Sequence, residues 1–398
     1  SAQQTTDGWL VQADAVPSLG MSTIRYAVVD TDRTEVLSQA SSVPYIHNSS
    51  SQAVMSSTAN AAGDLAVADP FFHYEEGKLT TPHYELEWNA HGQLTRVTDI
   101  QYGREVLANG ERGNVLQLFE DKPMNFDAWD IDIFYQERMD EITALHTVKL
   151  VESGPLRAVV EFVWSYGDTR IVQQLIVYTV SRRIDFVTDV DWKERQKLLK
   201  VAFPVQIRAT EATYDIQFGN VKRPTHWNTS WDWARFESVG HQWADLSERS
   251  YGVSLLNDCK YGYDIKDHTM RLSLLKSAIY PDPMADYGQH HFTYSLYPHG
   301  GDWLTGGTVQ EAWQLNAPCT AVQSGSLAEA TAQSSFSLFR FSADHVMADA
   351  IKKAEDSDAI ILRIHEYVGM RTPLTIQSDL KIASWQECNL MEEPIGEV

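Results

Sequence analysis

The sequence predicts a mostly β protein that contains one large antiparallel sandwich of two sheets. Three observations favour this fold class. Short runs of β-branched and aromatic residues, bounded by turn residues, recur along most of the chain. Windows with helical periodicity are few, and 398 residues with 43% hydrophobic content can bury a large core. Many strands with few helices are typical of a β-sandwich.

The first expected element is a small β unit over residues 1–46. The turn sequence VPSLG at residues 16–20 precedes a short apolar run at residues 22–29, which predicts a strand. Residues 47–66 are rich in Ser and Ala and lack apolar periodicity, so we expect a linker there. The chain begins with Ser1 instead of Met, which suggests a processed or truncated product.

The large sandwich is expected over residues 67–341. Tyr84, Leu86 and Trp88 alternate on one face of a strand, and a turn at residues 89–92 leads into a returning strand, which predicts a hairpin. Successive apolar runs with intervening turns predict further antiparallel strands. These runs lie at residues 156–164, 170–180, 184–190, 253–256, 272–275 and 292–297.

The last segment, residues 342–398, is expected to contain a helix and terminal β strands. A Ser342 or Asp344 cap precedes apolar residues whose spacing up to Glu355 places a stripe on one helical face. Such a stripe is typical of packing rather than of a ligand site. Apolar runs at residues 360–364, 374–376 and 381–385 predict the strands that follow.

Charge and cysteine content exclude several classes of function. The net charge of -22 repels phosphate backbones and anionic lipids, so we expect neither nucleic acid nor membrane as a partner. No window approaches the roughly 20 apolar residues of a membrane helix, and we expect a soluble protein. The chain contains an odd number of widely spaced cysteines, namely Cys259, Cys319 and Cys388. This pattern argues against a disulfide framework and favours a cytoplasmic location.

Polar and aromatic residues concentrate in three segments, at residues 119–132, 223–233 and 281–299. Tryptophan beside Asp, Asn, His and Arg suits a sugar site, because an apolar ring stacks on the sugar while polar groups read its hydroxyls. The candidate substrate-binding residues are Asp286, His290, Arg223, His226, Trp231, Asp232, Trp129 and Asp130.

A structural interpretation competes with each of these candidates. Trp also packs loops over a sandwich edge, and Asp also serves as a turn or cap acceptor, and for any single residue this role is about twice as common. Asp286 and His290 could form a hydrogen-bonded pair that shapes a loop. His290, His291 and His299 lack the spacing of a zinc site, so no metal site is predicted in this chain.

The same segments resemble glycoside hydrolase family 38, in particular its cytosolic-type and bacterial α-mannosidases. The matching residues include WDWARFE at 231–237, LLNDCKYG at 255–262, Asp286, Gly288 and His290, together with DAWD at 127–130. The resemblance covers most of the chain and is least specific in the linker and at the end.

This resemblance implies a galactose-mutarotase-like sandwich from the C-terminal part of an enzyme that hydrolyses terminal α-D-mannosides with retention. In the family, an N-terminal barrel carries the nucleophile and the zinc ligands. No residue of this sequence matches those motifs, so no catalytic residue and no cofactor are expected in this chain, and zinc is expected in the missing N-terminal domain. We expect the chain to be inactive alone, to form one wall of the active site and to have that domain as its partner.

Other interpretations stay open. The chain could be a free-standing carbohydrate-binding module, or a lyase-like sandwich that uses Tyr287 and His290. An exposed docking face would be apolar and larger than a monomer normally tolerates. Such a face could also bring two copies together as a homo-oligomer.

Overall fold

The computed structural model describes residues 1–5, 8–13, 16, 19–22, 54–55, 71–321 and 335–396. The chain divides into two compact units. The first combines Ser1–Val11 with Ser51–Ala321, and the second combines Gln12–Ser50 with Val322–Val398. The helices of the described residues are all too short or too polar to cross a membrane.

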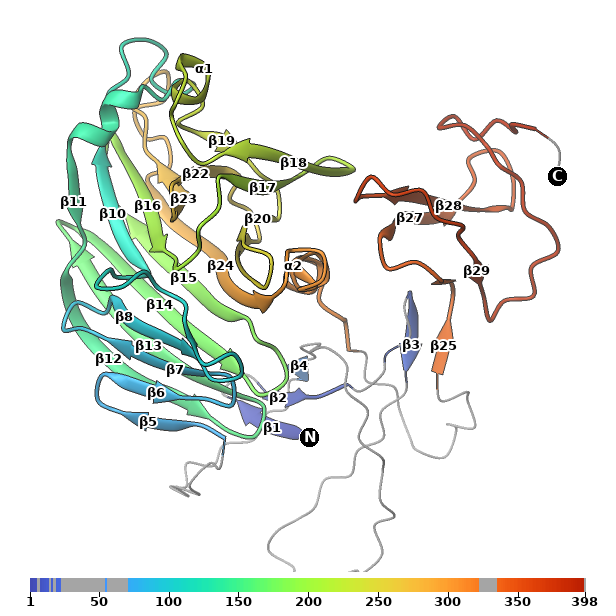
Figure 1. Ribbon diagram of the computed structural model, residues 1–398, viewed down its shortest axis with the longest axis horizontal. Coiled ribbons are helices and arrows are strands. Elements are labelled where there is room, and N and C mark those ends of the chain that lie inside the picture. Colours follow the sequence, from blue (N-terminus) through green and yellow to red (C-terminus); the bar gives the residue numbers. More distant parts are fainter. Residues whose placement is uncertain are drawn as a thin grey trace, which may run out of the picture. The chain divides into compact units, whose positions relative to one another are not determined.

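A nine-stranded antiparallel sheet is the largest sheet among the described residues (Figure 1). Its strands, in spatial order, are β12 (Ala144–Ser153), β13 (Arg157–Tyr166), β14 (Thr169–Tyr178), β15 (Ile184–Trp192), β24 (Gly288–Gly300), β21 (Tyr251–Asn257), β20 (Trp243–Ser247), β17 (Glu211–Ile216) and β18 (Gly219–Pro224). The three strands predicted between residues 156 and 190 are confirmed as β13, β14 and β15, which pair in sequence order.

A six-stranded sheet and a five-stranded sheet, counted within the described residues, share one hydrophobic core with the nine-stranded sheet. The six-stranded sheet orders β11 (Met139–Glu141), β10 (Val115–Glu120), β16 (Lys197–Pro204), β23 (Thr269–Lys276), β22 (Gly262–Lys266) and β19 (Ser238–Val239). The five-stranded sheet orders β5 (His73–Glu75), β6 (Lys78–Thr80), β7 (Tyr84–Trp88), β8 (Leu94–Asp99) and β9 (Arg104–Glu105).

The predicted hairpin over residues 84–97 is confirmed as β7 and β8. Gly92 in its turn has φ +74°, a conformation that disfavours a side chain. A Cβ at this position would also lie 2.6 Å from Cζ2 of Trp164. Glycine is therefore required both by the turn and by the packing of the sandwich.

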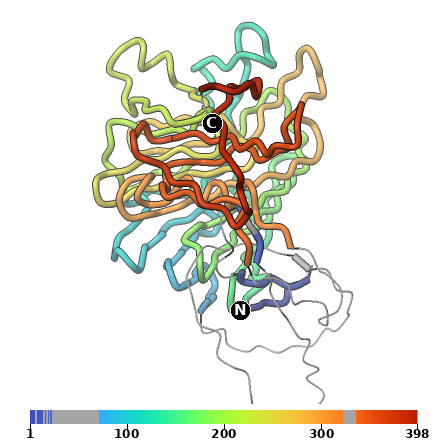
Figure 2. Tube along the Cα trace, turned by 90° about the vertical axis from the view of Figure 1, so that its right-hand side faces the viewer, coloured from blue at the N-terminus to red at the C-terminus, as the bar shows by residue number. Residues whose placement is uncertain are grey.

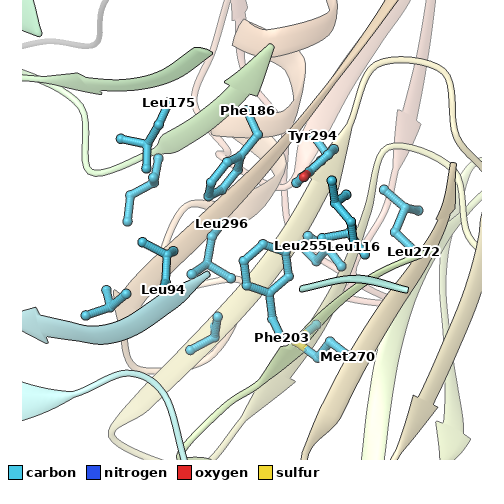
Figure 3. Packing of buried hydrophobic residues seen from close by; sticks show 14 of the residues in the cluster. Leu94, Leu116, Leu175, Phe186, Phe203, Leu255, Met270, Leu272, Tyr294 and Leu296 are labelled. Atoms are coloured by element: carbon cyan, nitrogen blue, oxygen red, sulfur yellow. The ribbon is translucent and has the colours of Figure 1, made fainter. Parts of the chain in front are cut away.

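One continuous hydrophobic core joins these sheets (Figure 3). Phe186, Tyr294 and Leu255 from the nine-stranded sheet meet Phe203 and Leu116 from the six-stranded sheet. Leu86 and Val97 of the hairpin belong to the same cluster and are fully buried. The predicted class, a mostly β protein with a large antiparallel sandwich, is confirmed.

Smaller elements complete the first unit. A three-stranded sheet contains β1 (Ala2–Thr5), β2 (Gly8–Val11) and β4 (Val54–Met55). The helix α2 (Thr308–Asn316) lies against β20 and β21 and was not predicted. Only Thr308, Val309 and Ala312 of this helix are buried, so its sequence carries too short an apolar stripe to indicate a helix.

The second unit contains three two-stranded sheets within the described residues. They pair β3 (Gly20–Ser22) with β25 (Ser335–Ser337), β26 (Arg340–Phe341) with β29 (Ile376–Gln377), and β27 (Val346–Lys353) with β28 (Ile360–Glu366). The strands β25 and β26, which precede the expected boundary at residue 341, group with the C-terminal segment.

The helix predicted over residues 342–355 is wrong. These residues form β27, which pairs with the Ile-rich β28 and has a register shift between Ala348 and Ala350. The extra residue, Asp349, breaks the two-residue alternation, so that exposed positions recur four residues apart, at Asp349 and Lys353. A bulged strand therefore imitates helical spacing. The strand predicted at residues 381–385 is also wrong, since this segment is irregular.

Part of the N-terminal prediction lies outside the described residues. The apolar run at residues 22–29 is described only at Ser22, the end of β3. The predicted linker at residues 47–66 is described only at residues 54–55, which form β4 and are therefore strand rather than linker.

Candidate functional site

Three loops gather at one end of the sandwich, at the top of both Figure 1 and Figure 2. Loop A (residues 121–132) joins β10 to the 3-10 helix η1 (Ile133–Glu137), and loop B (residues 225–237) contains α1 (Ser230–Trp233). Loop C (residues 277–287) joins β23 to β24. Both β10 and β23 are antiparallel to β16, so their C-terminal ends point the same way. All eight candidate residues lie on these loops or at the adjoining ends of β18 and β24.

Side-chain contacts tie loop A to loop C. Asp127 Oδ2 in loop A accepts a hydrogen bond of 2.7 Å from the backbone N–H of Ile279 in loop C. Asp121 pairs with Lys276 at the start of the same loop. Burial raises the pKa of Asp121 above its ordinary value, although Lys276 opposes this shift. Loops A and C therefore hold each other in place.

The candidates of loop B are largely used to build the loop. Asp232 accepts a 3.1 Å hydrogen bond from the backbone N–H of Thr229, whose hydroxyl accepts one of 3.2 Å from the backbone N–H of Asp232. This reciprocal pair is a capping box at the start of α1. Arg223 donates to the carbonyl of Val239 at 2.8 Å. His226 Nδ1 lies 3.7 Å from Asp232 Oδ2, beyond hydrogen-bond distance.

Loop C presents one carboxylate without a partner. The ring Nε2 of His290 lies 2.7 Å from the backbone carbonyl oxygen of Asp286. The hydrogen-bonded pair that the sequence left open is present, but it uses the backbone carbonyl of Asp286 rather than the carboxylate. The Asp286 side chain makes no hydrogen bond or ion pair with any described residue, and the residue has φ +56°. Asp adopts this left-handed conformation more readily than most residues, and its carboxylate stays free to accept hydrogen bonds.

Loop A presents an aromatic side chain and a second carboxylate. Trp129 is 74% exposed and its ring lies 5.8 Å from that of Phe126. Phe126 has φ +49°, so this loop too contains a backbone conformation that is rare for a bulky residue. Asp130 is exposed beside Trp129. These two residues, unlike Asp232 of loop B, are free to contact another molecule.

Exposed apolar side chains concentrate at this end of the sandwich. Trp231, at 76% exposed, is as accessible as Trp129. We call the aromatic end the surface formed by Met124, Phe126, Trp129, Trp231, Trp233, Tyr280, Met284 and Tyr287, all of which are exposed. Apolar groups of this size grouped on one surface are typical of a binding site or an interface.

A buried ionic network beneath loop B was missed by the sequence analysis. Lys200 in β16 is fully buried and pairs with Glu237 at the end of loop B, and its ammonium lies 3.5 Å from Asp264 Oδ2. The hydroxyl of Tyr135 donates to Glu237 Oε1 at 2.6 Å, and Arg271 donates to Asp264 at 3.0 Å. The signal for this network was the single Lys inside the apolar run of β16.

The electrostatics of this network follow from its burial. Burial raises the pKa of Glu237 above its ordinary value, the ammonium of Lys200 opposes the shift, and Asp264 adds to it. Burial also raises the pKa of Tyr135, so its hydroxyl stays protonated and can donate. The network joins η1 and loop B to the six-stranded sheet.

Two family models match this chain. Residues 79–284 match the glycosyl hydrolases family 38 C-terminal domain, and residues 345–398 match the family's C-terminal beta sandwich domain. The chain belongs to glycosyl hydrolase family 38. The first match spans β6 to loop C and therefore includes loops A and B and the ionic network.

Relatives of this family 38 chain are named α-mannosidases. The chain is 39% identical over 308 residues to alpha-mannosidase 2C1 of Homo sapiens, a match that covers 76% of this chain and 29% of that protein. It is 38% identical over 343 residues to alpha-mannosidase G of Dictyostelium discoideum, covering 84% of this chain and 30% of that protein. The chain thus spans less than a third of the length of these curated relatives.

A solved structure shows the same fold. An alpha-mannosidase from Enterococcus faecalis V583 superposes with a TM-score of 0.63 at 16% sequence identity. The superposition covers 80% of this chain and 40% of that chain. At this identity the likeness supports the fold of the family 38 sandwich.

The described part of this family 38 chain does not fit a zinc site. Among the residues that the structure describes, no three His, Cys, Asp or Glu side chains are placed to hold a metal ion together. His290 and His291 each have another partner, the carbonyl of Asp286 and the carboxylate of Asp189.

Proposed function

We propose that this chain is the C-terminal part of an α-mannosidase that hydrolyses terminal α-D-mannosides. In this proposal its aromatic end packs against the N-terminal part of the same enzyme and closes one wall of the active site. The observation that carries the proposal is the concentration of exposed Trp and unpaired carboxylates at one end of a sandwich whose relatives are named α-mannosidases.

The roles of the candidate residues follow from their contacts. Asp286 and Asp130 have free carboxylates that can accept hydrogen bonds from sugar hydroxyls. Trp129 and Trp231 offer exposed rings that can pack on the N-terminal part or on a sugar face. Arg223, Asp232 and His290 shape the loops on which these groups stand.

Catalysis with retention needs two carboxyl groups about 5 Å apart, one as nucleophile and one as acid/base. We assign both, and the zinc ligands, to the N-terminal part, and we propose that the present chain is inactive by itself. The family models are described as C-terminal, and the curated relatives are more than three times as long as the matched segments. A cytoplasmic location is proposed on the free cysteines Cys259, Cys319 and Cys388, which form no disulfide.

The complete polypeptide encoded by the gene provides the test. We expect it to hydrolyse an aryl α-mannoside and to leave the corresponding α-glucoside, α-galactoside and β-mannoside intact. Hydrolysis of another glycoside in preference to the α-mannoside would contradict the proposed substrate. Binding of mannosides without hydrolysis would favour a carbohydrate-binding module instead.

A further inference from the structure

A groove of about 350 Å³ lies on the face of the six-stranded sheet opposite the core, at the foot of loops A and B. Gly262 and Ser273 form its floor, where a Cβ at position 262 would lie 3.1 Å from Cβ of Ser273. Ile131, Val239 and Leu275 line the groove above this floor. The groove exists because two small residues lie side by side on neighbouring strands.

The walls of the groove are fixed before anything binds. Ile131 packs against the cluster of Phe119, Tyr135 and Leu198. Glu237 also lines the groove and is held by Lys200 and by the 2.6 Å hydrogen bond from Tyr135. A preformed pocket binds without the cost of ordering its own side chains.

The lining indicates what the groove can accept. Its apolar groups are aliphatic, whereas sugar sites usually offer an aromatic face. Val239 is 57% exposed, so the rim of the groove is accessible to another molecule. The hydroxyl of Ser273 is buried and has no hydrogen-bond partner among the described residues. Because this oxygen is inaccessible from the groove, the complementary group is aliphatic.

We propose that this groove receives an aliphatic side chain from the N-terminal part of the complete enzyme. The inference rests on the proposed function and identifies a contact between the N-terminal part and the present chain. The groove is continuous with loops A and B, which carry the aromatic end, and the curated relatives contain more than two thirds of their length outside the matched segment.

The test is the rate at which iodoacetamide labels a cysteine placed at the rim, Val239→Cys. Labelling is measured peptide by peptide with mass spectrometry, in the 398-residue chain and in the complete enzyme. We expect labelling to be at least tenfold slower in the complete enzyme. Val151→Cys on β12, a position that is 37% exposed and distant from the groove in sequence, is the matched control and should label at the same rate in both proteins.

A second pair of variants tests the floor of the groove. Ser273→Leu fills it and should return the labelling rate of Val239→Cys in the complete enzyme to that of the 398-residue chain. Ser273→Ala keeps the groove open and should preserve most of the protection. Equal protection in both variants would show that the groove itself is not the contact.

Other occupants give different outcomes, and each overturns the proposal. Protection that depends on the concentration of the 398-residue chain would assign the groove to a second copy. Protection that requires added mannoside would assign it to substrate. Full labelling in a complete enzyme that cleaves α-mannosides would exclude the groove as a contact and leave the proposed function intact. A complete enzyme that does not hydrolyse α-mannosides would contradict the proposed function itself.

Discussion

The imidazole of His290 lies 2.7 Å from the backbone carbonyl oxygen of Asp286, and this contact leaves the carboxylate of Asp286 free. We expect Asp286→Asn in the complete enzyme to lower kcat/KM for an aryl α-mannoside at least tenfold, which is about 1.4 kcal/mol of transition-state stabilisation. Asn tolerates positive φ, so the loop should keep its shape. Steady-state kinetics and thermal melting of the variant provide the measurement.

Asp267→Asn is the matched control for this substitution. Asp267 is exposed like Asp286 and also has a positive φ, of +52°. It lies in the turn between β22 and β23, at the opposite end of β23 from loop C. Its substitution should leave kcat/KM unchanged. If both variants lose the same activity, Asp286 has no special role.

The aromatic end should matter to the complete enzyme more than to this chain. Trp129→Ala and Trp231→Ala remove side chains that are 74% and 76% exposed, so the free energy of unfolding of the 398-residue chain should change by no more than about 0.5 kcal/mol. The same substitutions should lower the melting temperature of the complete enzyme, because the proposed contact with the N-terminal part would bury these rings. Phe218→Ala, at a position 71% exposed in the turn between β17 and β18, should affect neither protein.

The ionic network beneath loop B should show strong coupling between its members. Lys200→Met leaves Glu237 and Asp264 buried without their ammonium, which should cost about 3–5 kcal/mol in urea unfolding at neutral pH. Glu237→Gln should cost less, because Lys200 keeps Asp264 as a partner. The double variant should be more stable than the sum of the two losses predicts, and additive losses would contradict the coupling.

Glu237 also makes the free energy of unfolding depend on pH, with a sign that follows from its pKa shift. Burial raises the pKa of Glu237, so the stability that this group contributes is complete below the pKa of the unfolded chain and is lost as the pH rises through the folded pKa. Glu237→Gln cannot titrate. The wild-type chain should therefore lose free energy of unfolding relative to this variant as the pH rises from the ordinary carboxyl range, and parallel pH curves would contradict the shift.

The hairpin between β7 and β8 allows a test of the fold. Gly92→Ala forces a Cβ into a positive φ and against Trp164, so we expect a loss of about 2–4 kcal/mol in urea unfolding. Gly103→Ala is the control, because its φ of +57° carries the same strain but no atom lies within 4 Å of the added Cβ. It should lose about 1 kcal/mol. Equal losses would show that the contact with Trp164 is not tight.

Alternation and turn chemistry were sufficient to predict the central strands of the sandwich. One face of β7 is buried in the core and contains Tyr84, Leu86 and Trp88. Their two-residue spacing therefore predicts the strand directly. The same rule failed at β27, because the extra residue at Asp349 shifts the alternation by one position. It also failed at α2, where only three residues of the helix are buried.

Composition was sufficient to identify the three loops as candidate sites, but it could not give the role of each residue. Asp232 and Asp286 are both Asp in a polar loop, and only the structure shows that one builds a helix cap and the other is free. Lys200 and Glu237 are 37 residues apart in the chain, so their pairing depends on a contact that no local pattern encodes. Sugar binding by the exposed residues stays a prediction.

The most direct test of the account is the hydrolysis of an aryl α-mannoside by the 398-residue chain itself, measured beside the complete enzyme. We predict no turnover above buffer and no stoichiometric zinc for this chain, because its described residues offer no metal site. The complete enzyme should turn over the substrate and lose this activity on chelation. Turnover by the 398-residue chain that is abolished by chelation, and absent from a mock preparation, would contradict the assignment of catalysis to the N-terminal part.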